Sequence, residues 1–200
     1  MSQQMIISIA REFGSGGHEI AEKLAAKYAL PLYDQSLLKN IAQKHNVQLD
    51  VLERFDERPR NKLLSRTEKG LSSSPEHNVA QFQFDYLKEK AASGESFVVV
   101  GRCAETILRE YESLITIFIH ADMETRVKRT MEHENVSEKR ARLMIRETDA
   151  RRKQYHNSYS DFKWGRARGY DITIDSAKMG IDGTVDMLSL YIDARRNKVK

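Results

Sequence analysis

The stretch MIISIAREFGSGGHEIAEKLAAKY, from Met5 to Tyr28, decides how the rest of the chain is interpreted. Its first six residues form an apolar, β-branched run that is short enough for a buried strand. A polar turn with three glycines follows, and then apolar residues such as Ile20 and Leu24 recur at helical spacing. This order is typical of phosphate binding, because glycines let backbone N–H groups approach an anion and the helix start adds unpaired donors. The sequence therefore predicts a phosphate-binding loop from Gly14 to Glu19.

The loop differs from the standard phosphate-binding pattern G-x-x-x-x-G-K-[ST]. If Gly17 is the second glycine, Glu12 stands at the first glycine, His18 at the lysine and Glu19 at the hydroxyl residue. A neutral histidine supplies no fixed charge to a phosphate. Glu19 complements the dipole of a helix start but repels a nearby anion. A tight strand-to-helix turn without a ligand therefore stays open as the alternative interpretation.

Composition and charge narrow the class of protein. The 200 residues suit a single domain, residues 1–200, with a sizeable core. Thirty-three basic residues against twenty-nine acidic ones give a net charge of +4, which is too small to require a nucleic-acid partner. The single cysteine, Cys103, excludes an internal disulfide and a cysteine-rich metal site. No apolar stretch approaches membrane length and no signal-peptide pattern is present, so we expect a cytoplasmic protein without a membrane partner.

Further along the chain, apolar runs alternate with stretches of helical spacing. After the first helix, which ends near residue 29, the pattern predicts strands at residues 30–34, 97–100, 114–119 and 171–175, and helices at residues 37–45, 47–55, 79–92 and 181–194. Asp122 and Ser137 are expected to cap two more helices, and residues 155–169 are expected to form a loop. Five strands separated by helices predict an α/β fold, a five-stranded parallel sheet with helices on both faces.

Two side chains follow predicted strands and become candidates for a site. In a parallel α/β sheet the carboxyl ends of the strands line the ligand crevice, which favours Asp34 and Arg102. Arg102 is suited to a bidentate contact with phosphate. An equal alternative is that Asp34 or Ser36 only caps the next helix. Cys103 is interpreted as a small buried residue, because no group that would activate its thiol is evident.

Two polar stretches remain. Residues 57–78 are the least core-like part of the chain and predict an exposed excursion, either a flap over the site or a solvated linker. The helix after Ser137 carries the densest basic stretch, with Arg140, Arg142, Arg146, Arg151, Arg152 and Lys153. Interleaved acidic residues allow a merely solvated face through i,i+4 pairs, but the local excess of basic residues favours anion binding.

A phosphate loop after the first strand, with an arginine-rich helix late in the chain, is the layout of a small phosphotransferase, which works by positioning and charge neutralisation. Most of the chain, from Met5 to about Ala194, resembles the cytidylate kinase-like family of P-loop nucleoside monophosphate kinases. The resemblance lies in the segments ISIAREFGSGGHEIAEKLA, LPLYD, VVVGRCAE, FIHADMETRVKR, IRETDARRKQY and YDITIDSAKMGIDGTVDML.

The resemblance implies a fold of the P-loop kinase type, with a helical lid at about residues 137–165 and a small inserted lobe at about residues 37–80. It implies transfer of the γ-phosphoryl group of ATP, with Mg²⁺, to CMP, a related nucleoside monophosphate or another small acceptor. The residues that would hold the ATP phosphates are Gly14, Ser15, Gly16, Gly17, His18 and Glu19, and Ser15 could also supply a hydroxyl to Mg²⁺.

The remaining roles are implied in the same way. Arg126 and Arg129 fall where such kinases meet the adenine, and Asp34 and Arg102 fall where they contact the acceptor. The catalytic group comprises His18 and the lid residues Arg146, Asp149, Arg151 and Arg152.

Two departures from cytidylate kinases keep other functions open: His18 replaces the loop lysine, and Cys103 replaces an aspartate after Gly101-Arg102. The first alternative is a catalytically weak or inactive nucleotide-binding protein, such as a sensor, on the same fold. The second is a nucleic-acid binder that uses the basic helix, which ranks last because no aromatic residues are interleaved with its basic ones. The sequence does not fix the oligomeric state.

Overall fold

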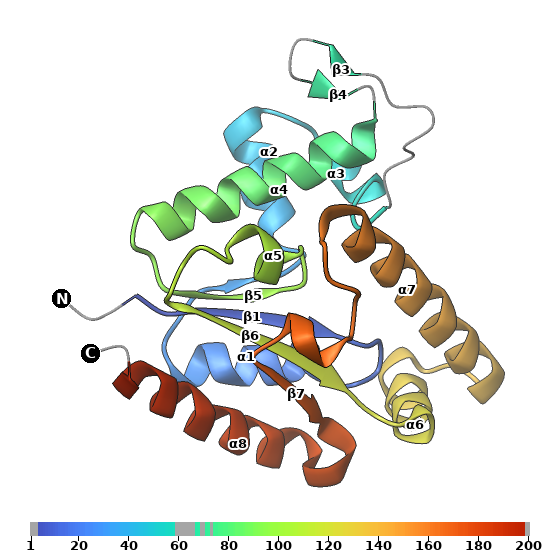
Figure 1. Ribbon diagram of the computed structural model, residues 1–200. Helices are drawn as coiled ribbons and strands as arrows, with labels where there is room; N and C mark the ends of the chain where they lie inside the picture. The colour runs from blue at the N-terminus through green and yellow to red at the C-terminus, as the bar shows by residue number, and fades with distance from the viewer. Residues whose placement is uncertain (1–3, 59–66, 69–70, 73, 199–200) are drawn as a thin grey trace.

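A five-stranded parallel sheet forms the centre of the molecule (Figure 1). The computed structural model describes residues 4–58, 67–68, 71–72 and 74–198. The strands lie in the order β2-β5-β1-β6-β7, and every neighbouring pair is parallel. They are β1 (Ile6–Arg11), β2 (Leu32–Tyr33), β5 (Phe97–Val100), β6 (Leu114–His120) and β7 (Ile172–Asp175). The predicted α/β class and its five parallel strands are confirmed.

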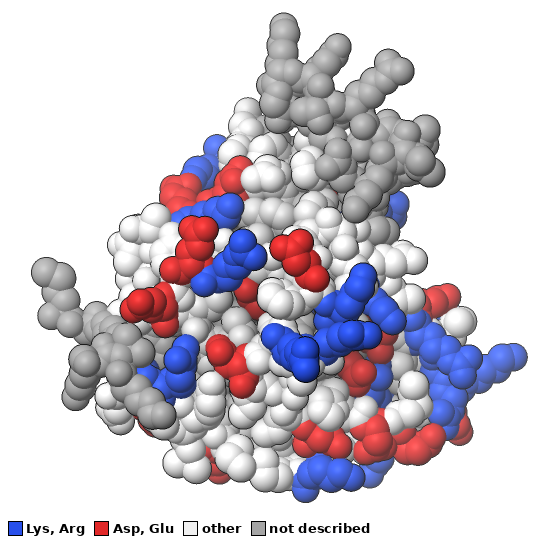
Figure 2. Space-filling model, in the orientation of Figure 1, with Lys and Arg blue, Asp and Glu red and all other residues white. Residues whose placement is uncertain are grey.

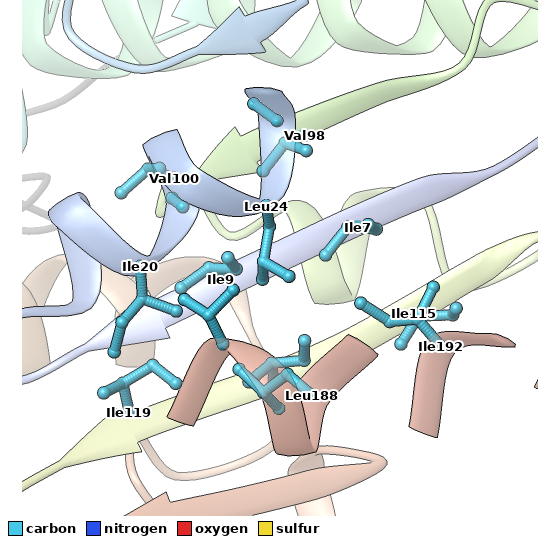
Figure 3. Close-up of a cluster of buried hydrophobic side chains, with 14 of the residues drawn as sticks. Ile7, Ile9, Ile20, Leu24, Val98, Val100, Ile115, Ile119, Leu188 and Ile192 are labelled. Carbon is cyan, nitrogen blue, oxygen red and sulfur yellow. The ribbon is translucent and has the colours of Figure 1, made fainter. Parts of the chain in front are cut away.

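Helices cover both faces of the sheet, which explains why the central strands are apolar without alternation. Ile7 and Ile9 of β1 point into a cluster that contains residues of α1 (Gly17–Lys27) and α8 (Ser176–Lys198). Figure 3 shows Ile20 and Leu24 of α1 and Leu188 and Ile192 of α8 against these strands. Ile6 points to the opposite face, toward α2 (Leu37–His45), α3 (Leu49–Arg54), α4 (Pro75–Ala92) and α5 (Ala104–Ile107).

Helix boundaries follow local capping chemistry. The Asp122 carboxylate accepts the Thr125 N–H at 2.9 Å at the start of α6 (Met123–Glu134). The Ser137 hydroxyl accepts the Arg140 N–H at 3.4 Å at the start of α7 (Glu138–Tyr159). Both predicted caps are confirmed, and α2 has the predicted bounds. Helix α4 begins four residues before the predicted start, because Ser74 caps it and Pro75 suits the first helical position.

Two further boundaries differ from the prediction by several residues. Helix α7 continues to Tyr159, where a loop was expected from residue 155, because Tyr155 packs in a buried cluster with Phe84 and Cys103. Helix α8 begins at Ser176, five residues before the expected start, and its first turn is separated from the rest by the non-helical Gly180. A short 3₁₀ helix, η1 (Ala167–Gly169), precedes β7.

The excursion predicted at residues 57–78 is described only in part, since residues 59–66, 69–70 and 73 lie outside the described residues. The described remainder includes an antiparallel pair of short strands, β3 (Thr67–Glu68) and β4 (Leu71–Ser72). In Figure 1 this pair lies apart from the main sheet, beyond α4. The inserted lobe at about residues 37–80 and the lid at about 137–165 stay predictions. Within the described ranges, no helix is long and apolar enough to cross a membrane.

The strand order creates one natural place for a ligand. From β1 the chain crosses toward β2 on one side of the sheet, and from β5 it crosses toward β6 on the other. Because β1 and β5 are neighbours, their carboxyl ends flank a point where the connections diverge, and α/β proteins bind ligands at such points. The predicted phosphate-binding loop and the Gly101-Arg102-Cys103 segment both lie there.

Candidate functional site

The loop after β1, residues 12–19, keeps several backbone donors available; we call it the glycine loop. Gly14 and Gly16 adopt left-handed conformations with φ of 75° and 78°. The Ser15 hydroxyl donates to the Glu12 carbonyl at 2.8 Å and closes the turn. Within the described part of the chain, the N–H groups of Gly14 and of residues 16–19 donate no hydrogen bond. A row of free amides at the start of α1 is the arrangement that binds a phosphate group.

Two charged residues hold the first half of the glycine loop. The Phe13 N–H donates to the Asp149 carboxylate of α7 at 2.8 Å, and Arg126 Nε of α6 donates to the Phe13 carbonyl at 2.7 Å. The buried Arg126 guanidinium also pairs with Asp149 and lies 3.1 Å from Glu12. Asp149 and Arg126 therefore fix both polar groups of the Phe13 backbone, so that the glycine loop depends on two helices far away in sequence.

Arg129 holds the second half of the loop. Its Nη1 atom donates to the Ser15 carbonyl and to the Ser176 hydroxyl, both at 2.9 Å. The Ser176 hydroxyl itself donates to the Ser15 carbonyl at 2.5 Å. The family resemblance places Arg126 and Arg129 near adenine. In the structure, these guanidinium N–H groups donate hydrogen bonds to carbonyl groups of the glycine loop.

His18 and Asp34 meet beside the loop. His18 Nε2 lies 2.8 Å from Asp34 Oδ2, and its Nδ1 lies 3.6 Å from Glu22. The other Asp34 oxygen accepts the Ser36 N–H at 2.8 Å at the start of α2. Burial acts to raise the pKa of Asp34, but hydrogen bonds from His18 and Ser36 outweigh it and leave that pKa below its ordinary value. Asp34 therefore does both things considered from the sequence: it lies by the loop and it binds a helix start.

A hollow beside the loop is rich in arginine. It is lined by Ala10, Arg11, Glu57, Gly101, Arg102, Cys103, Glu105, Arg152, Tyr155, His156 and Trp164; we call it the arginine hollow. The Arg102 side chain is only 3% exposed and is paired with Asp56. Glu57 lies between two other guanidinium groups, 3.7 Å from Arg11 Nη1 and 3.7 Å from Arg152 Nε.

Charge in the arginine hollow is close to balanced but leans positive. Burial acts to raise the pKa of Glu57, yet Arg11, Arg102 and Arg152 outweigh it and lower that pKa to about 2. Burial, together with repulsion from Arg152 and Arg102, lowers the pKa of Arg11 to about 9. The arginines are thus crowded enough to destabilise one another, and the Glu57 carboxylate is what relieves them.

This balance predicts a specific response to acid. The pKa of Glu57 falls from 4.5 to about 2 on folding, so its stabilising effect is complete above pH 4.5 and is lost as pH falls toward 2. We expect Glu57→Gln to lower the free energy of unfolding at pH 7 by roughly 2 kcal/mol. The difference between wild type and variant should shrink below pH 4.5, as measured by urea denaturation across pH. A difference that stays constant down to pH 2.5 would contradict the assignment.

The segment after β5 has an unusual backbone. Gly101, Arg102 and Cys103 are successive residues with φ of 74°, 61° and 52°, a conformation that side chains disfavour. Such conformations cluster at functional sites. The Cys103 thiol is buried and burial raises its pKa, so Cys103 is the small buried residue that the sequence predicts. Two residues on, the buried Glu105 carboxylate lies 2.8 Å from His156 Nε2 of α7.

Two of the basic lid candidates face solvent. Arg146 and Arg151 are exposed and make no ion pair within the described ranges, whereas Asp149 and Arg152 face the body of the protein. Figure 2 shows Lys and Arg side chains gathered over the side of the molecule where α7 lies. The structure therefore brings Arg152 and Asp149 into contact with the loop region and leaves Arg146 and Arg151 exposed to solvent.

The side chains near the glycine loop do not form a metal site by themselves, but they suit a metal ion that a bound nucleotide carries. Across the described residues, no three His, Cys, Asp or Glu side chains are grouped to hold a metal ion. Ser15 is fully buried, and its hydroxyl already donates to Glu12. Glu12 and Asp149 are engaged with Arg126, whereas the exposed Glu19 and the partly buried Asp34 are carboxylates beside the start of α1. Two carboxylates without a closed cage fit Mg²⁺, which usually takes its other ligands from phosphates and water.

Four charged or titratable residues that line the arginine hollow were not anticipated from the sequence: Arg11, Glu57, Glu105 and His156. Arg11 could have been found, because it ends β1 at the sheet's carboxyl edge, where a charged residue follows five buried ones. Glu57 pairs with Arg11 across 46 positions and with Arg152 across 95, so no local pattern reveals it. The Glu105–His156 pair depends in the same way on how α7 packs beside α5.

The fold and the glycine loop define a class: this is a P-loop kinase fold, with a parallel sheet and a glycine-rich loop between β1 and α1. A solved structure with the same fold is a shikimate kinase from Acinetobacter baumannii in complex with shikimate. It is 14% identical, has a TM-score of 0.56, and the match covers 100% of this chain and 97% of that one.

Within that class the family is also determined. The family model described as the cytidylate kinase-like family matches residues 6–178, and the chain belongs to that family. A cytidylate kinase of Methanocaldococcus jannaschii is 23% identical over 192 residues, which is 94% of this chain and 98% of that protein. The crystal structure of an uncharacterized protein from Eubacterium ventriosum is 40% identical with a TM-score of 0.76, and the match covers 95% of this chain and 99% of that one.

Proposed function

We propose that this protein transfers the γ-phosphoryl group of ATP to a small acceptor, either CMP, a related nucleoside monophosphate or another small molecule. One observation carries the proposal: the free amides of the glycine loop and the guanidinium groups of the arginine hollow lie at the same corner of the sheet. Arg152 Nη1 lies close to the start of the loop, because it donates at 3.4 Å to the carbonyl of Arg11, the residue immediately before it. Phosphoryl transfer needs this convergence of positive groups on one reacting phosphate.

The residues divide into donor, acceptor and neutralising groups. Gly14, Ser15, Gly16, Gly17, His18 and Glu19 form the loop that takes the donor phosphates. Asp34 and the arginine hollow lie on the acceptor side, and Arg126 and Arg129 position the loop while lying toward the adenine end. Arg146 and Arg151 are exposed and are assigned to neutralising the transferred phosphate, and Asp149 and Arg152 hold α7 against the loop region.

Mg²⁺ is the metal that such chemistry uses, and Glu19 and Asp34 are the side chains of this chain that would approach it. When bound, the ion neutralises charge on the donor phosphates. The work left to the chain is to orient the phosphates through the loop amides and to exclude water from the hollow.

One observation favours a second candidate, a nucleotide-binding protein with weak or no transfer activity. His18, in place of the lysine, is held between Asp34 and Glu22, and no hydroxyl residue follows it. In this case ATP would raise the melting temperature without any production of ADP.

The test is a coupled assay of ADP production with nucleoside monophosphates, nucleosides and small alcohols as acceptors. We expect turnover with at least one acceptor, and we expect His18→Lys to raise kcat/KM for ATP about tenfold, because lysine supplies a fixed positive charge at the phosphates. His133→Lys is the matched control, since His133 is 86% exposed and lies on α6 away from the loop. Turnover with no acceptor, together with stabilisation by ATP, would favour the second candidate. An unchanged kcat/KM in His18→Lys would contradict the placement of His18 at the phosphates.

A further inference from the structure

The Glu57 carboxylate occupies a place that suits the anionic group of a ligand. It lies 3.7 Å from both Arg11 and Arg152, close enough for attraction but beyond hydrogen-bond distance. By contrast, Arg102 is tightly paired with Asp56, and both side chains are almost fully buried. Arg11 and Arg152 are therefore guanidinium groups whose anionic partner is only loosely held.

The local backbone also favours release of Glu57. This residue has a φ of 48°, in the left-handed region that a residue with a side chain disfavours. The Arg152 Nε atom is buried and has no hydrogen-bond partner within the described residues. An unused buried donor beside a loosely held carboxylate is unfavourable, and a ligand that satisfies the donor would remove that cost.

Arg11 and Arg152 lie where an acceptor would have to bind in order to react with a phosphate held by the glycine loop. Arg11 ends β1 immediately before the loop, and Gly101 leaves room for it at the end of β5. A side chain on Gly101 would bring its Cβ within 2.5 Å of Arg11 Nη1. The two arginines thus face the point where the chain leaves β1 and β5 in opposite directions.

We propose that Arg11 and Arg152 bind a phosphate monoester group of the acceptor, and that Glu57 occupies this site until the acceptor displaces it. Charge selects the ligand class. With Glu57 displaced, Arg102 stays paired with Asp56 and Glu105 stays beside His156, whereas the two guanidinium groups of Arg11 and Arg152 lose their carboxylate partner. A phosphate monoester dianion neutralises both, and a monocarboxylate neutralises only one. The proposal rests on the proposed function only in taking the anion to be the acceptor's.

Calorimetry with inorganic phosphate at pH 7.5 and constant ionic strength tests the anion site without turnover. We expect Glu57→Gln to bind phosphate about tenfold more tightly than wild type, because the internal competitor has lost its charge. Arg11→Gln should bind it about tenfold more weakly. Arg109→Gln is the matched control, since Arg109 is 60% exposed and does not line the arginine hollow. Sulfate should follow phosphate, and acetate should respond much less.

Each result decides the proposal. If wild type, Glu57→Gln and Arg11→Gln bind phosphate with equal affinity, the anion binds only at the glycine loop and the proposal is wrong. Tighter binding of acetate than of phosphate would overturn the ligand class. If Glu57→Gln does not fold, Glu57→Asp keeps the charge but shortens its reach, and it should give a smaller gain in phosphate affinity; no gain would count against the proposal.

The coupled assay of ADP production tests separately whether the anion bound at this site is the phosphate of the acceptor. A lower KM for the acceptor in Glu57→Gln supports the full proposal. If phosphate affinity changes as expected while no acceptor is turned over, the anion site stands and the proposed phosphotransferase activity fails. If turnover occurs but neither KM nor phosphate affinity responds to Glu57→Gln, the activity stands and the role of Glu57 is wrong.

Discussion

Asp149→Ala is expected to lower the free energy of unfolding by about 3 kcal/mol, because it removes one of the two carboxylates that pair with the buried Arg126 guanidinium. Asp149 makes two contacts that disappear together: it accepts the Phe13 N–H and it pairs with the buried Arg126. The Phe13 amide is then without an acceptor, which adds to the cost. Urea denaturation at pH 7 measures the change, and binding of ATP should weaken because the glycine loop loses its support.

Two further variants sharpen this test. Asp149→Asn keeps an oxygen for the Phe13 N–H but loses the charge, so we expect a loss of roughly half that of alanine. Asp161→Ala is the matched control: Asp161 is 90% exposed and lies 3.9 Å from Arg109, and its loss should cost less than about 0.5 kcal/mol. Equal stability of Asp149→Ala and Asp161→Ala would show that the contact of α7 with the loop does not stabilise the fold.

Gly14→Ala is expected to cost about 3 kcal/mol of stability and to abolish nucleotide binding. Gly14 has a φ of 75°, and a Cβ atom there would lie 2.8 Å from the Arg126 carbonyl oxygen and 2.7 Å from the Thr130 hydroxyl. The left-handed conformation alone costs about 1 kcal/mol for alanine, and the contact with backbone adds the rest. Relieving the clash between the new Cβ atom and Arg126 would move the start of α6 away from the glycine loop, which Arg126 holds in place.

Gly94 provides a control for the part of this loss of stability that comes from the left-handed backbone conformation alone. Gly94 has a φ of 80°, but a Cβ atom there would have no neighbour within 4 Å. Gly94→Ala should therefore lose only about 1 kcal/mol and retain full binding of ATP. Thermal denaturation and calorimetry with ATP compare the two variants. If Gly14→Ala is no less stable than Gly94→Ala and still binds ATP, close packing around Gly14 is not what shapes the loop.

Those features of the fold that depend on neighbours in sequence could be predicted. The apolar run of β1, the three glycines and the spacing of Ile20 and Leu24 define the strand, loop and helix. The caps Asp122 and Ser137 define helix starts for the same reason, since a cap bonds only three residues ahead. Where the expectation was wrong, the decisive contact was distant, as with Tyr155, whose burial against α4 and Cys103 extends α7.

The candidate site also contains features that could be predicted from the sequence and features that depend on distant contacts. The glycine loop, Asp34 and Arg102 could be placed because they follow predicted strands, whose carboxyl ends share one edge of a parallel sheet. Their partners could not. The pairing of Arg102 with Asp56 and the position of Glu57 between Arg11 and Arg152 depend on strand order and on the side of α7 that faces the sheet, which no local pattern specifies.

Helix α7 touches three parts of the site through one stripe of side chains. Asp149, Arg152 and His156 are spaced by three and four positions, which aligns them on one side of a helix. Asp149 meets the glycine loop, Arg152 meets Glu57 and the end of β1, and His156 meets Glu105. Because a helix moves as one rod, ordering any one of these contacts helps to order the others. If the proposed phosphoryl transfer is correct, we therefore expect ATP and the acceptor to bind synergistically, each raising the affinity for the other by the same factor.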